Sequence, residues 1–296
     1  MNHRAPLFCQ RWRDHRASYR PAGEPINPSD YEVAPITETE AKAFIIQHHY
    51  SRSFVVSRFN YGLFSRFIRH EHWNQSGLTP ELVGVASFSV SQHPAVVTNV
   101  FPGNPHDSVE LGRFVLLDHA PSNCETWFEK RCRQLLKKEG IRGIVAFADD
   151  IARHSFDGQI LFPGHIGTIY ASDNWAFIGR GARKTLFLFS DGTSLARRTL
   201  SKIRNRESGF EYACSLLVER GASDPGKDPR AWLDHWLPKL TTRLPHPGCL
   251  KFAFPLSNKI HPVRPRLPYP KRYATETEML AAKQNAAIRP TQPPTK

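Results

Sequence analysis

The chain has 296 residues and a mass of 33.7 kDa, about twice the ~150 residues of a typical domain, so one large domain or a domain with an insertion is expected. With 40% hydrophobic and 23% charged residues, the composition excludes a fibrous or disordered chain. The five cysteines are odd in number and form no C-x-x-C pair, which argues against a disulfide framework and a thiolate zinc site. No apolar run reaches the ~20 residues of a membrane helix, and the first residues lack the apolar stretch of a signal peptide, so we expect a cytoplasmic protein.

The net charge of +13 is unevenly distributed. Residues 30–193 carry 16 basic and 17 acidic side chains, whereas residues 1–29, 194–256 and 257–296 carry net charges of +3, +5 and +6. This distribution predicts a near-neutral core with basic attachments that bind a polyanion, and nucleic acid is the leading partner. Basic tails that only aid solubility are the alternative interpretation.

Between residues 30 and 193 the hydrophobic pattern predicts alternating strands and helices. A helix is expected from about Thr37, with Ala41, Phe44, Ile45 and His48 along one side. Runs of apolar and small residues predict strands over residues 57–67, 81–90, 109–118, 141–150 and 182–190.

The second helix of this region has clear end signals. Ser122 and Glu125 have the spacing of a capping box, and Gly140 is the expected stop. Residues 164–174 are expected to form a short helix or turn. The alternation of strands and helices predicts an α/β layer with locally parallel strands.

From Ser194 the pattern becomes helical, over residues 194–207, 209–221 and 229–240, before a last strand at 249–256. We therefore expect one domain over residues 30–256 that carries a basic helical insertion, residues 194–245, before its last strand. Residues 1–29 and 257–296 are expected to be poorly ordered basic arms, although Tyr269 and Tyr273 among basic residues could also lie along a nucleic-acid backbone.

Arg113 lies in the strand expected over residues 109–118. Alternation places it on the same face as Leu111, Val115 and Leu117, with Glu110 on the other face. An arginine in an apolar row needs a carboxylate, a phosphate or backbone oxygens as partner. Arg113 is therefore either one half of a structural pair, for example with Asp149, or a ligand of a bound anion.

Asp149 and Asp150 end the strand expected over residues 141–150, where open α/β sheets usually bind ligands. Adjacent strand residues point in opposite directions, so one of the two faces a given site, and we favour Asp149. Its carboxylate could act as a general base or bind a metal. An ordinary acidic loop is the alternative.

The loop before the helix at Ser122 directs backbone N–H groups toward its surroundings, which is a natural seat for phosphate. The same helix end could lower the pKa of Cys124, although a core position explains that residue equally well. The run from His48 to Arg52, which includes His49 and Tyr50, offers a metal ligand or an acid, or simply a histidine-stabilised helix end.

The insertion carries a basic helix face, which predicts either a solvated surface or contact with phosphates. The residues of that face are Arg197, Arg198, Lys202, Arg204 and Arg206.

Several separated segments together resemble a known family. The stretch IYASDNWAFIG, residues 169–179, contains a Tyr170 and Trp175 spacing similar to the Tyr-x-x-x-x-Phe stretch of GNAT acyltransferases. More closely, the segments HHYSRS, RFNYGLF, LVGVASFSV, ELGRFVLLD, GTIYASDNWAFIGRG and TLSKIRNRESGFEYA resemble the Mom family of phage DNA-modification proteins.

This resemblance spans residues 40–256 and implies a GNAT-like mixed sheet flanked by helices. It implies a transferase that converts adenine amino groups of double-stranded DNA to a carbamoylmethyl form and so shields phage DNA from restriction. The candidate catalytic residues it implies are Tyr50, Arg113, Asp149 and Tyr170. Ser122 and Asn123 are the candidate cofactor-binding residues. The resemblance makes acyl-coenzyme A a candidate cofactor, but the DHAPSN stretch lacks the glycines of the GNAT pyrophosphate loop.

An adenine amino group is a poor nucleophile, so transfer needs an oriented electrophile, a base and a holder of negative charge. The expected roles are Asp149 as base, Tyr170 as acid or orienting hydroxyl, and Arg113 or the helix end at Ser122 as anion holder. Two other functions stay open: a GNAT N-acyltransferase acting on a small amine or a protein, and a nucleic-acid-binding module without catalysis.

Overall fold

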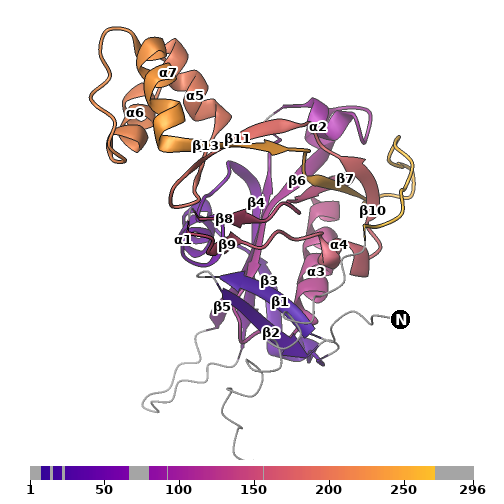
Figure 1. Ribbon diagram of the computed structural model, residues 1–296. Helices are drawn as coiled ribbons and strands as arrows, with labels where there is room; N and C mark the ends of the chain where they lie inside the picture. The colour runs from indigo at the N-terminus through magenta and orange to yellow at the C-terminus, as the bar shows by residue number, and fades with distance from the viewer. Residues whose placement is uncertain are drawn as a thin grey trace, which may run out of the picture. The chain divides into compact units, whose positions relative to one another are not determined.

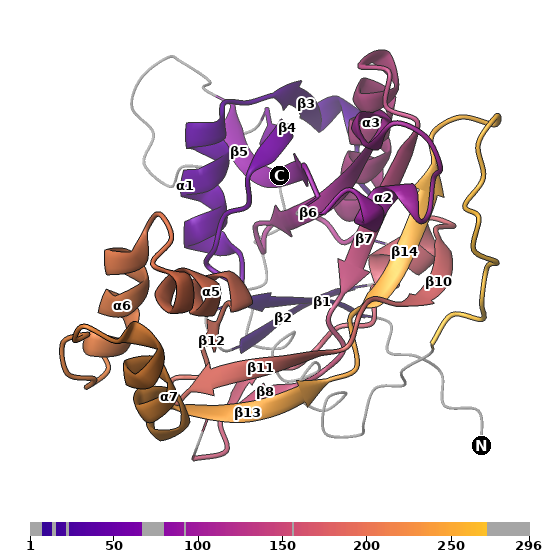
Figure 2. The same cartoon turned by 90° about the horizontal axis from the view of Figure 1, so that it is seen from above.

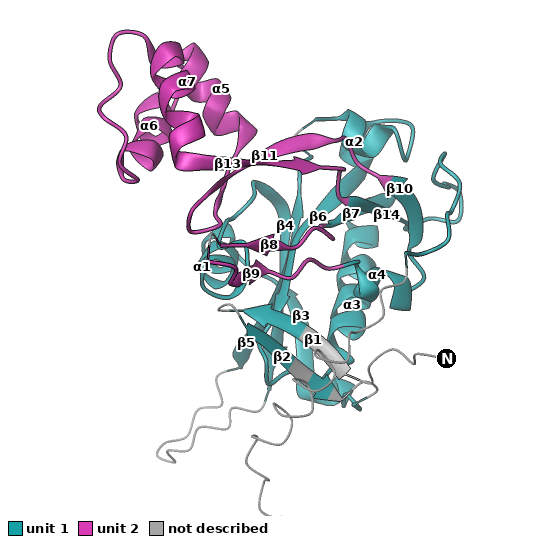
Figure 3. Ribbon diagram, viewed as in Figure 1, with its two compact units in different colours: residues 1–148, 166–179, 250–296 teal, residues 149–165, 180–249 magenta. Residues whose placement is uncertain are grey.

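A computed structural model describes residues 8–13, 16–21, 24–66, 80–91, 93–155 and 157–270, and Figure 1 shows the chain with its elements labelled. The chain divides into two compact units (Figure 3). Unit 1 consists of residues 1–148, 166–179 and 250–296, and unit 2 of residues 149–165 and 180–249. Tyr273 and the end of the expected C-terminal tail lie outside the described residues. No helix of the described residues has the length and hydropathy needed to span a membrane.

Unit 1 is built on a seven-stranded sheet with the strand order β10-β14-β7-β6-β5-β4-β3. β6 and β7 run parallel, whereas the neighbouring pairs from β3 to β6, and β7 with β14, are antiparallel. The sheet is therefore mixed, and the expected fold class of a mixed sheet flanked by helices is confirmed. The strands are β3 (Tyr31–Pro35), β4 (Ser57–Ser65), β5 (Glu81–Ser89), β6 (Ser108–Leu116), β7 (Gly143–Ala148), β10 (Ala176–Arg180) and β14 (Leu250–Pro255).

Helices cover both faces of this sheet (Figure 2). On one face α1 (Glu38–His48) packs Ala41, Phe44 and Ile45 against Val85 and Val115 of the sheet. On the other face α3 (Cys124–Lys138) and α4 (Thr168–Ser172) belong to the largest hydrophobic cluster of the unit. The short elements of the unit are η1 (Pro28–Asp30), α2 (Ala95–Thr98) and η2 (Pro105–Asp107).

The sequence signals located α1 better than the start of α3. Thr37 caps α1 through a full capping box with Glu40, so the helix begins where the sequence predicted it. The capping box expected at Ser122 is wrong, because α3 begins at Cys124 after Asn123 and no side chain caps it. Its C-terminal signal is confirmed, since the helix ends at Lys138 and Gly140 follows with a φ of +77°.

A bulge at Gly112 changes the side-chain alternation of β6. In the pairing with β5, Ser87 lies opposite Arg113 and Phe88 opposite Leu111, so Gly112 is the extra residue. Leu111 before the bulge packs with the α3 cluster, whereas Val115 after it packs with the α1 cluster. The expectation that Leu111, Arg113 and Val115 share one face is therefore wrong: past the bulge, the odd-numbered positions turn to the α1 side.

The parallel pairing of β6 and β7 is short. It joins Ser108–Leu111 to residues 143–146, and β6 then continues to Leu116 without β7 as its partner. The two strands thus separate toward their carboxyl ends, which is where open α/β sheets place ligand groups.

Residues expected to form a poorly ordered arm include a β-hairpin. β1 (Phe8–Arg13) pairs with β2 (Arg16–Pro21) in an antiparallel register. The Arg11 guanidinium bonds to Glu125 of α3, so long-range contacts give this basic segment a structure that its local pattern does not predict.

Unit 2 contains the three helices predicted for the insertion: α5 (Arg197–Asn205), α6 (Phe210–Val218) and α7 (Pro229–Leu240). They share a hydrophobic cluster with a three-stranded sheet of order β12-β11-β13. The strands of this unit are β8 (Arg153–His154), β9 (Ile160–Phe162), β11 (Lys184–Phe189), β12 (Ser194–Leu195) and β13 (Thr241–His246).

Candidate functional site

Four of the polar side chains of unit 1 influence one another electrostatically near the bulge of β6. Arg113 interacts with the charges of Tyr50 and Glu110, and Tyr170 interacts with the same two residues. The bulge explains why Arg113 and Glu110 are neighbours, because it reverses the alternation between them. Three of the four, Tyr50, Arg113 and Tyr170, are residues that the sequence singled out, and we call the four residues the β6 polar group.

Arg113 is anchored to the loop that follows α1. Its Nε donates to the Ser53 carbonyl at 2.7 Å, one terminal nitrogen donates to Ser53 Oγ at 2.9 Å, and the other donates to the Gly112 carbonyl at 2.7 Å. Among the described residues, Arg113 donates to these three oxygens and not to Asp149, so the pair suggested with Asp149 is not formed. Three of the five guanidinium N–H groups are used in this way, and the bonds hold the loop near Tyr50 on the strand.

Glu110 is the member of the group that sequence reasoning placed on the wrong face and did not select. Burial raises its pKa, although the nearby charges of Arg113 and Lys251 oppose part of that shift. A carboxylate with a raised pKa is a better proton acceptor near neutral pH than an ordinary one. The signal that could have found it is Gly112, because a glycine inside a strand often marks a bulge.

Tyr170 is buried in the core of unit 1. Its ring lies 5.0 Å from the ring of Trp175 and 5.0 Å from that of Phe252. Burial, and then the charges of Tyr50, Glu129 and Glu110, raise its pKa above the ordinary value. The hydroxyl therefore stays protonated, so it suits an orienting or donating role and not that of a base.

Asp149 belongs to unit 2 and is held by several partners. One carboxylate oxygen accepts a hydrogen bond from His246 Nε2 at 2.9 Å and another from the Ile151 N–H at 3.2 Å, and the other oxygen pairs with Arg153. Burial raises the pKa of Asp149, but the His246 hydrogen bond and the Arg153 charge bring it below its usual value. Asp150 points elsewhere and pairs with Arg180 at 2.6 Å. These contacts fix Asp149 and make its carboxylate a weak base.

Asp149, His246 and Cys249 form the one group of three potential metal-ligand side chains that the described residues bring within 4.8 Å of one another. His246 is fully committed, because its Nδ1 accepts the Gly248 N–H at 3.1 Å while its Nε2 donates to Asp149. Arg153 and Lys184 place positive charge beside Asp149 and Cys249. This chemistry fits a hydrogen-bonded Asp–His pair better than a cation site.

The helix end expected to seat a phosphate is occupied by the protein's own side chains. The Ser122 N–H donates to a Glu24 carboxylate oxygen at 3.1 Å, and the Asn123 side-chain amide donates to the Glu24 carbonyl at 2.9 Å. Arg11 covers the carbonyls of the same loop. A carboxylate at this position repels a pyrophosphate, so these residues do not fit acyl-coenzyme A and we derive no step through it.

Two further sequence candidates have structural explanations. Burial raises the pKa of Cys124 to about 12, so its thiol is not an activated nucleophile. The His48 ring packs 4.6 Å from Phe44, and His49 Nδ1 lies 2.8 Å from Ser51 Oγ. These contacts favour the interpretation in which the histidines stabilise the end of α1.

The basic residues of α5 differ in their surroundings. Arg197 and Arg204 line a groove of unit 2 with a volume of about 920 Å³. Arg198 pairs with Glu207 at 2.5 Å, and Arg206 donates to the Lys227 carbonyl at 2.9 Å. Lys202 is half-buried near Gly209.

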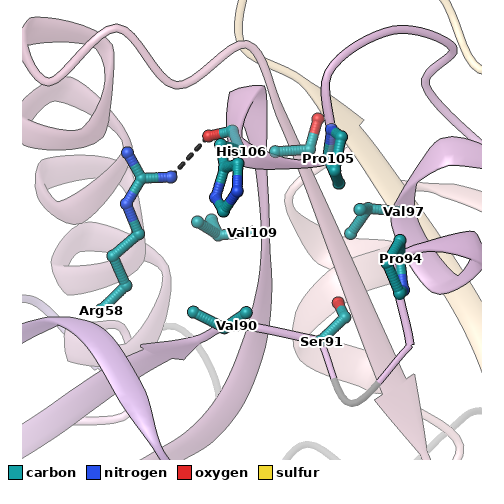
Figure 4. A pocket seen from close by; sticks show the side chains of 9 residues that line it. Arg58, Val90, Ser91, Pro94, Val97, Pro105, His106 and Val109 are labelled. Carbon is teal, nitrogen blue, oxygen red and sulfur yellow. Dashed lines mark hydrogen bonds between the residues drawn. The ribbon is translucent and has the colours of Figure 1, made fainter.

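Unit 1 also contains a small pocket, shown in Figure 4. Its volume is about 90 Å³, and Arg58 donates to the His106 carbonyl at its edge. Pockets for small organic ligands usually measure ~300–1,000 Å³, so this pocket is too small to hold a nucleobase. It is lined by Arg58, Val90, Ser91, Pro94, Val97, Pro105, His106, Ser108 and Val109.

The described residues define a mixed α/β protein with a polar group beside a bulged strand of one unit and a cationic groove in the other. A model of the Mom protein family matches residues 30–222, and the chain belongs to this family. The resemblance found in the sequence is thus confirmed. A comparison with curated proteins finds no match.

Two solved structures are similar to this chain over 77% of its length. One is a tandem GNAT protein from the clavulanic acid biosynthesis pathway, with 9% identity, a TM-score of 0.37 and 99% of that chain covered. The other is the ribosomal-protein-S18-alanine N-acetyltransferase from Escherichia coli, with 10% identity, a TM-score of 0.31 and 94% of that chain covered.

Proposed function

We propose that this protein is a transferase that modifies adenine amino groups of double-stranded DNA with a carbamoylmethyl-type group and thereby shields phage DNA from restriction. The observation that carries the proposal is the match to the Mom protein family over residues 30–222. The β6 polar group and the basic insertion support it, because they supply proton-transfer chemistry and attraction for a polyanion.

The transfer forms a bond between the adenine amino nitrogen and an electrophilic carbon of the donor, whose leaving group departs with the bonding electrons. The nitrogen must also lose a proton, and we assign the acceptor role to Glu110 in preference to Asp149. Glu110 has a raised pKa, whereas both carboxylate oxygens of Asp149 are bonded and its pKa is lowered. Asp149 instead holds His246 in position.

The remaining members of the β6 polar group have roles that follow from their charge. Arg113 keeps its positive charge beside Glu110 and stabilises negative charge that develops on the donor. Tyr170 stays protonated and orients a hydrogen-bond acceptor, and Tyr50 completes the group at the end of α1. Reaching the amino group requires the base to leave the duplex stack, which costs a few kcal/mol that binding of the DNA backbone must supply.

The proposal is tested by expressing the protein in a bacterial host, digesting the host DNA to nucleosides and searching for a heavier deoxyadenosine by mass spectrometry. We expect the modified nucleoside with the wild-type protein and a loss of at least 100-fold with Glu110→Gln, because a general base typically contributes ~10²–10⁴-fold. Glu32→Gln is the matched control, since Glu32 is an exposed carboxylate on β3 of the same sheet.

The variants also separate the two candidate bases. Asp149→Asn is expected to reduce modification less than Glu110→Gln, and the reverse order would return the base role to Asp149. Normal DNA together with acylated protein or small amines would replace the proposal with an N-acyltransferase. DNA binding without any modified product would reduce the protein to a binding module.

A further inference from the structure

The groove of unit 2 is strongly basic. Five of its lining side chains are arginine or lysine, and none is a carboxylate. Its volume of about 920 Å³ is ten times that of the pocket in unit 1. The basic lining residues are Arg183, Lys184, Arg197, Arg204 and Arg243.

Secondary structure brings these cations together from three parts of the chain. Arg197 and Arg204 lie seven positions apart in α5, which places them on one side of the helix. β11 and β13 pair antiparallel, with Lys184 opposite His246 and Phe187 opposite Arg243. The folding of unit 2, and not closeness in the sequence, therefore brings these cations together.

Four of the five cations have no carboxylate partner among the described residues, and one of them, Lys184, contacts the Cys249 sulfur. Arg183, Arg197 and Arg243 are exposed, and none forms an ion pair with a described residue. The Arg243 guanidinium lies 5.9 Å from the centre of the Phe187 ring, which limits the orientations of that side chain. Arg204 faces Asp234 at 3.6 Å, but both side chains are exposed and such a pair is weak.

Uncompensated like charges in one groove repel one another, and a polyanion removes that cost. Arg197 and Arg204 are separated by ~10 Å along the helix axis, which is the length of about three nucleotides of one DNA strand. Arg198 and Arg206 on the same helix are already bonded to Glu207 and to a backbone carbonyl. Of the four arginines between residues 197 and 206, the two that are not held in this way, Arg197 and Arg204, thus line the groove.

We propose that the groove lined by Arg183, Lys184, Arg197, Arg204 and Arg243 binds the phosphodiester backbone of duplex DNA. The inference rests on the proposed function, which makes duplex DNA the substrate. It assigns backbone contact to Arg183, Lys184 and Arg243, which sequence reasoning did not select. It also removes Arg198 and Arg206 from the DNA-binding set predicted from the sequence.

The test measures binding of the purified full-length protein to an unmodified fluorescent DNA duplex by anisotropy between 0.05 and 0.5 M salt, with no donor present. We compare Arg197→Gln/Arg243→Gln with Arg198→Gln/Arg206→Gln, which removes the same charge. The loss of two phosphate contacts lowers the slope of log affinity against log salt by about 1.8 and weakens binding about 30-fold at 0.15 M salt. The control pair is expected to change affinity less than threefold.

Equal losses in the two variants would overturn the inference, as would wild-type affinity in the groove variant. Binding of the wild-type protein to an RNA hairpin but not to duplex DNA would also overturn it. Because no donor is present, a failure of the proposed base modification leaves these binding results intact and is seen separately in the nucleoside analysis.

A second measurement does not depend on the folding of a variant. Lys184 lines the groove, whereas Lys239 lies on α7 outside its lining. We expect duplex DNA to protect Lys184 from an amine-acetylating reagent at 0.05 M salt but not at 0.5 M salt. Lys239 should be labelled at both salt concentrations, with or without DNA. Labelling of Lys184 that is unaffected by DNA at low salt would contradict the proposal.

Discussion

Replacement of Arg11 by Met tests how the N-terminal hairpin holds the loop before α3. The Arg11 guanidinium bonds to Glu125 at 2.7 Å, with only 9% and 15% of the two side chains exposed. It also donates to four loop carbonyls at 2.7–3.2 Å, those of Leu117, Asp118, Ala120 and Pro121. Methionine keeps the apolar stem and removes the guanidinium that bonds to the nearly buried Glu125 carboxylate.

Breaking a buried ion pair by removing one partner costs about 3–5 kcal/mol. At about 2–4 °C per kcal/mol for a chain of this size, the melting temperature is expected to fall by at least about 6 °C. Circular dichroism during urea and thermal unfolding measures both quantities. Arg16→Met, on the exposed part of the same hairpin, is the control and should change stability by less than about 0.5 kcal/mol.

A double-mutant cycle decides whether the charge pair is responsible. Adding Glu125→Gln to Arg11→Met should recover part of the loss, because no charged carboxylate is then left buried. A loss below about 1 kcal/mol for Arg11→Met alone, or the same loss in both backgrounds, would refute the reasoning.

Three other outcomes follow from buried groups of unit 1. Burial raises the pKa of Glu129 from 4.5 to about 9, so the folded state keeps a proton that the unfolded state releases. The free energy of unfolding should therefore fall between pH 4.5 and 9 by up to ~1.4 kcal/mol per pH unit. Urea unfolding of Glu129→Gln should show a smaller fall, and an unchanged pH dependence would contradict the shift. A Cβ on Gly143 would lie 2.4 Å from the Phe101 ring, so Gly143→Ala should lose about 1–3 kcal/mol of stability by chemical denaturation, and wild-type stability would show that the ring moves freely. Cys124 should not react with a disulfide reagent until the protein is unfolded in urea, because burial raises its pKa to about 12; rapid reaction in the native state would show an accessible thiolate.

Local signals predicted those parts of the fold in which neighbouring residues supply the evidence. The start of α1 was predicted because Thr37 and Glu40 form a capping box next to an apolar stripe. The hairpin of β1 and β2 was missed, because its sequence has no apolar alternation and its Arg11 contacts lie more than 100 residues away. The start of α3 was misplaced for the same reason, since Glu125 bonds to Arg11 and not to its own helix end.

The candidate site shows the same limit. Arg113 was selected because it is a polar residue in an apolar strand, but its hydrogen-bond partners were not predictable without the bulge at Gly112. One partner of Asp149, His246, is 97 positions away and carries no local signal. The basic character of the insertion is evident from its composition. Which of its arginines are paired can be seen only when their neighbours in the folded structure are known.

The position of β14 has a consequence for any shortened form of the protein. The family match ends at Ala222, but β14 (Leu250–Pro255) lies inside the sheet of unit 1 between β7 and β10. A fragment that stops at Ala222 would leave the apolar edge of β7 unpaired, and an unpaired strand edge is a template for aggregation. Expression trials should therefore keep the chain at least to Leu256, even though the family's recognisable part ends 34 residues earlier.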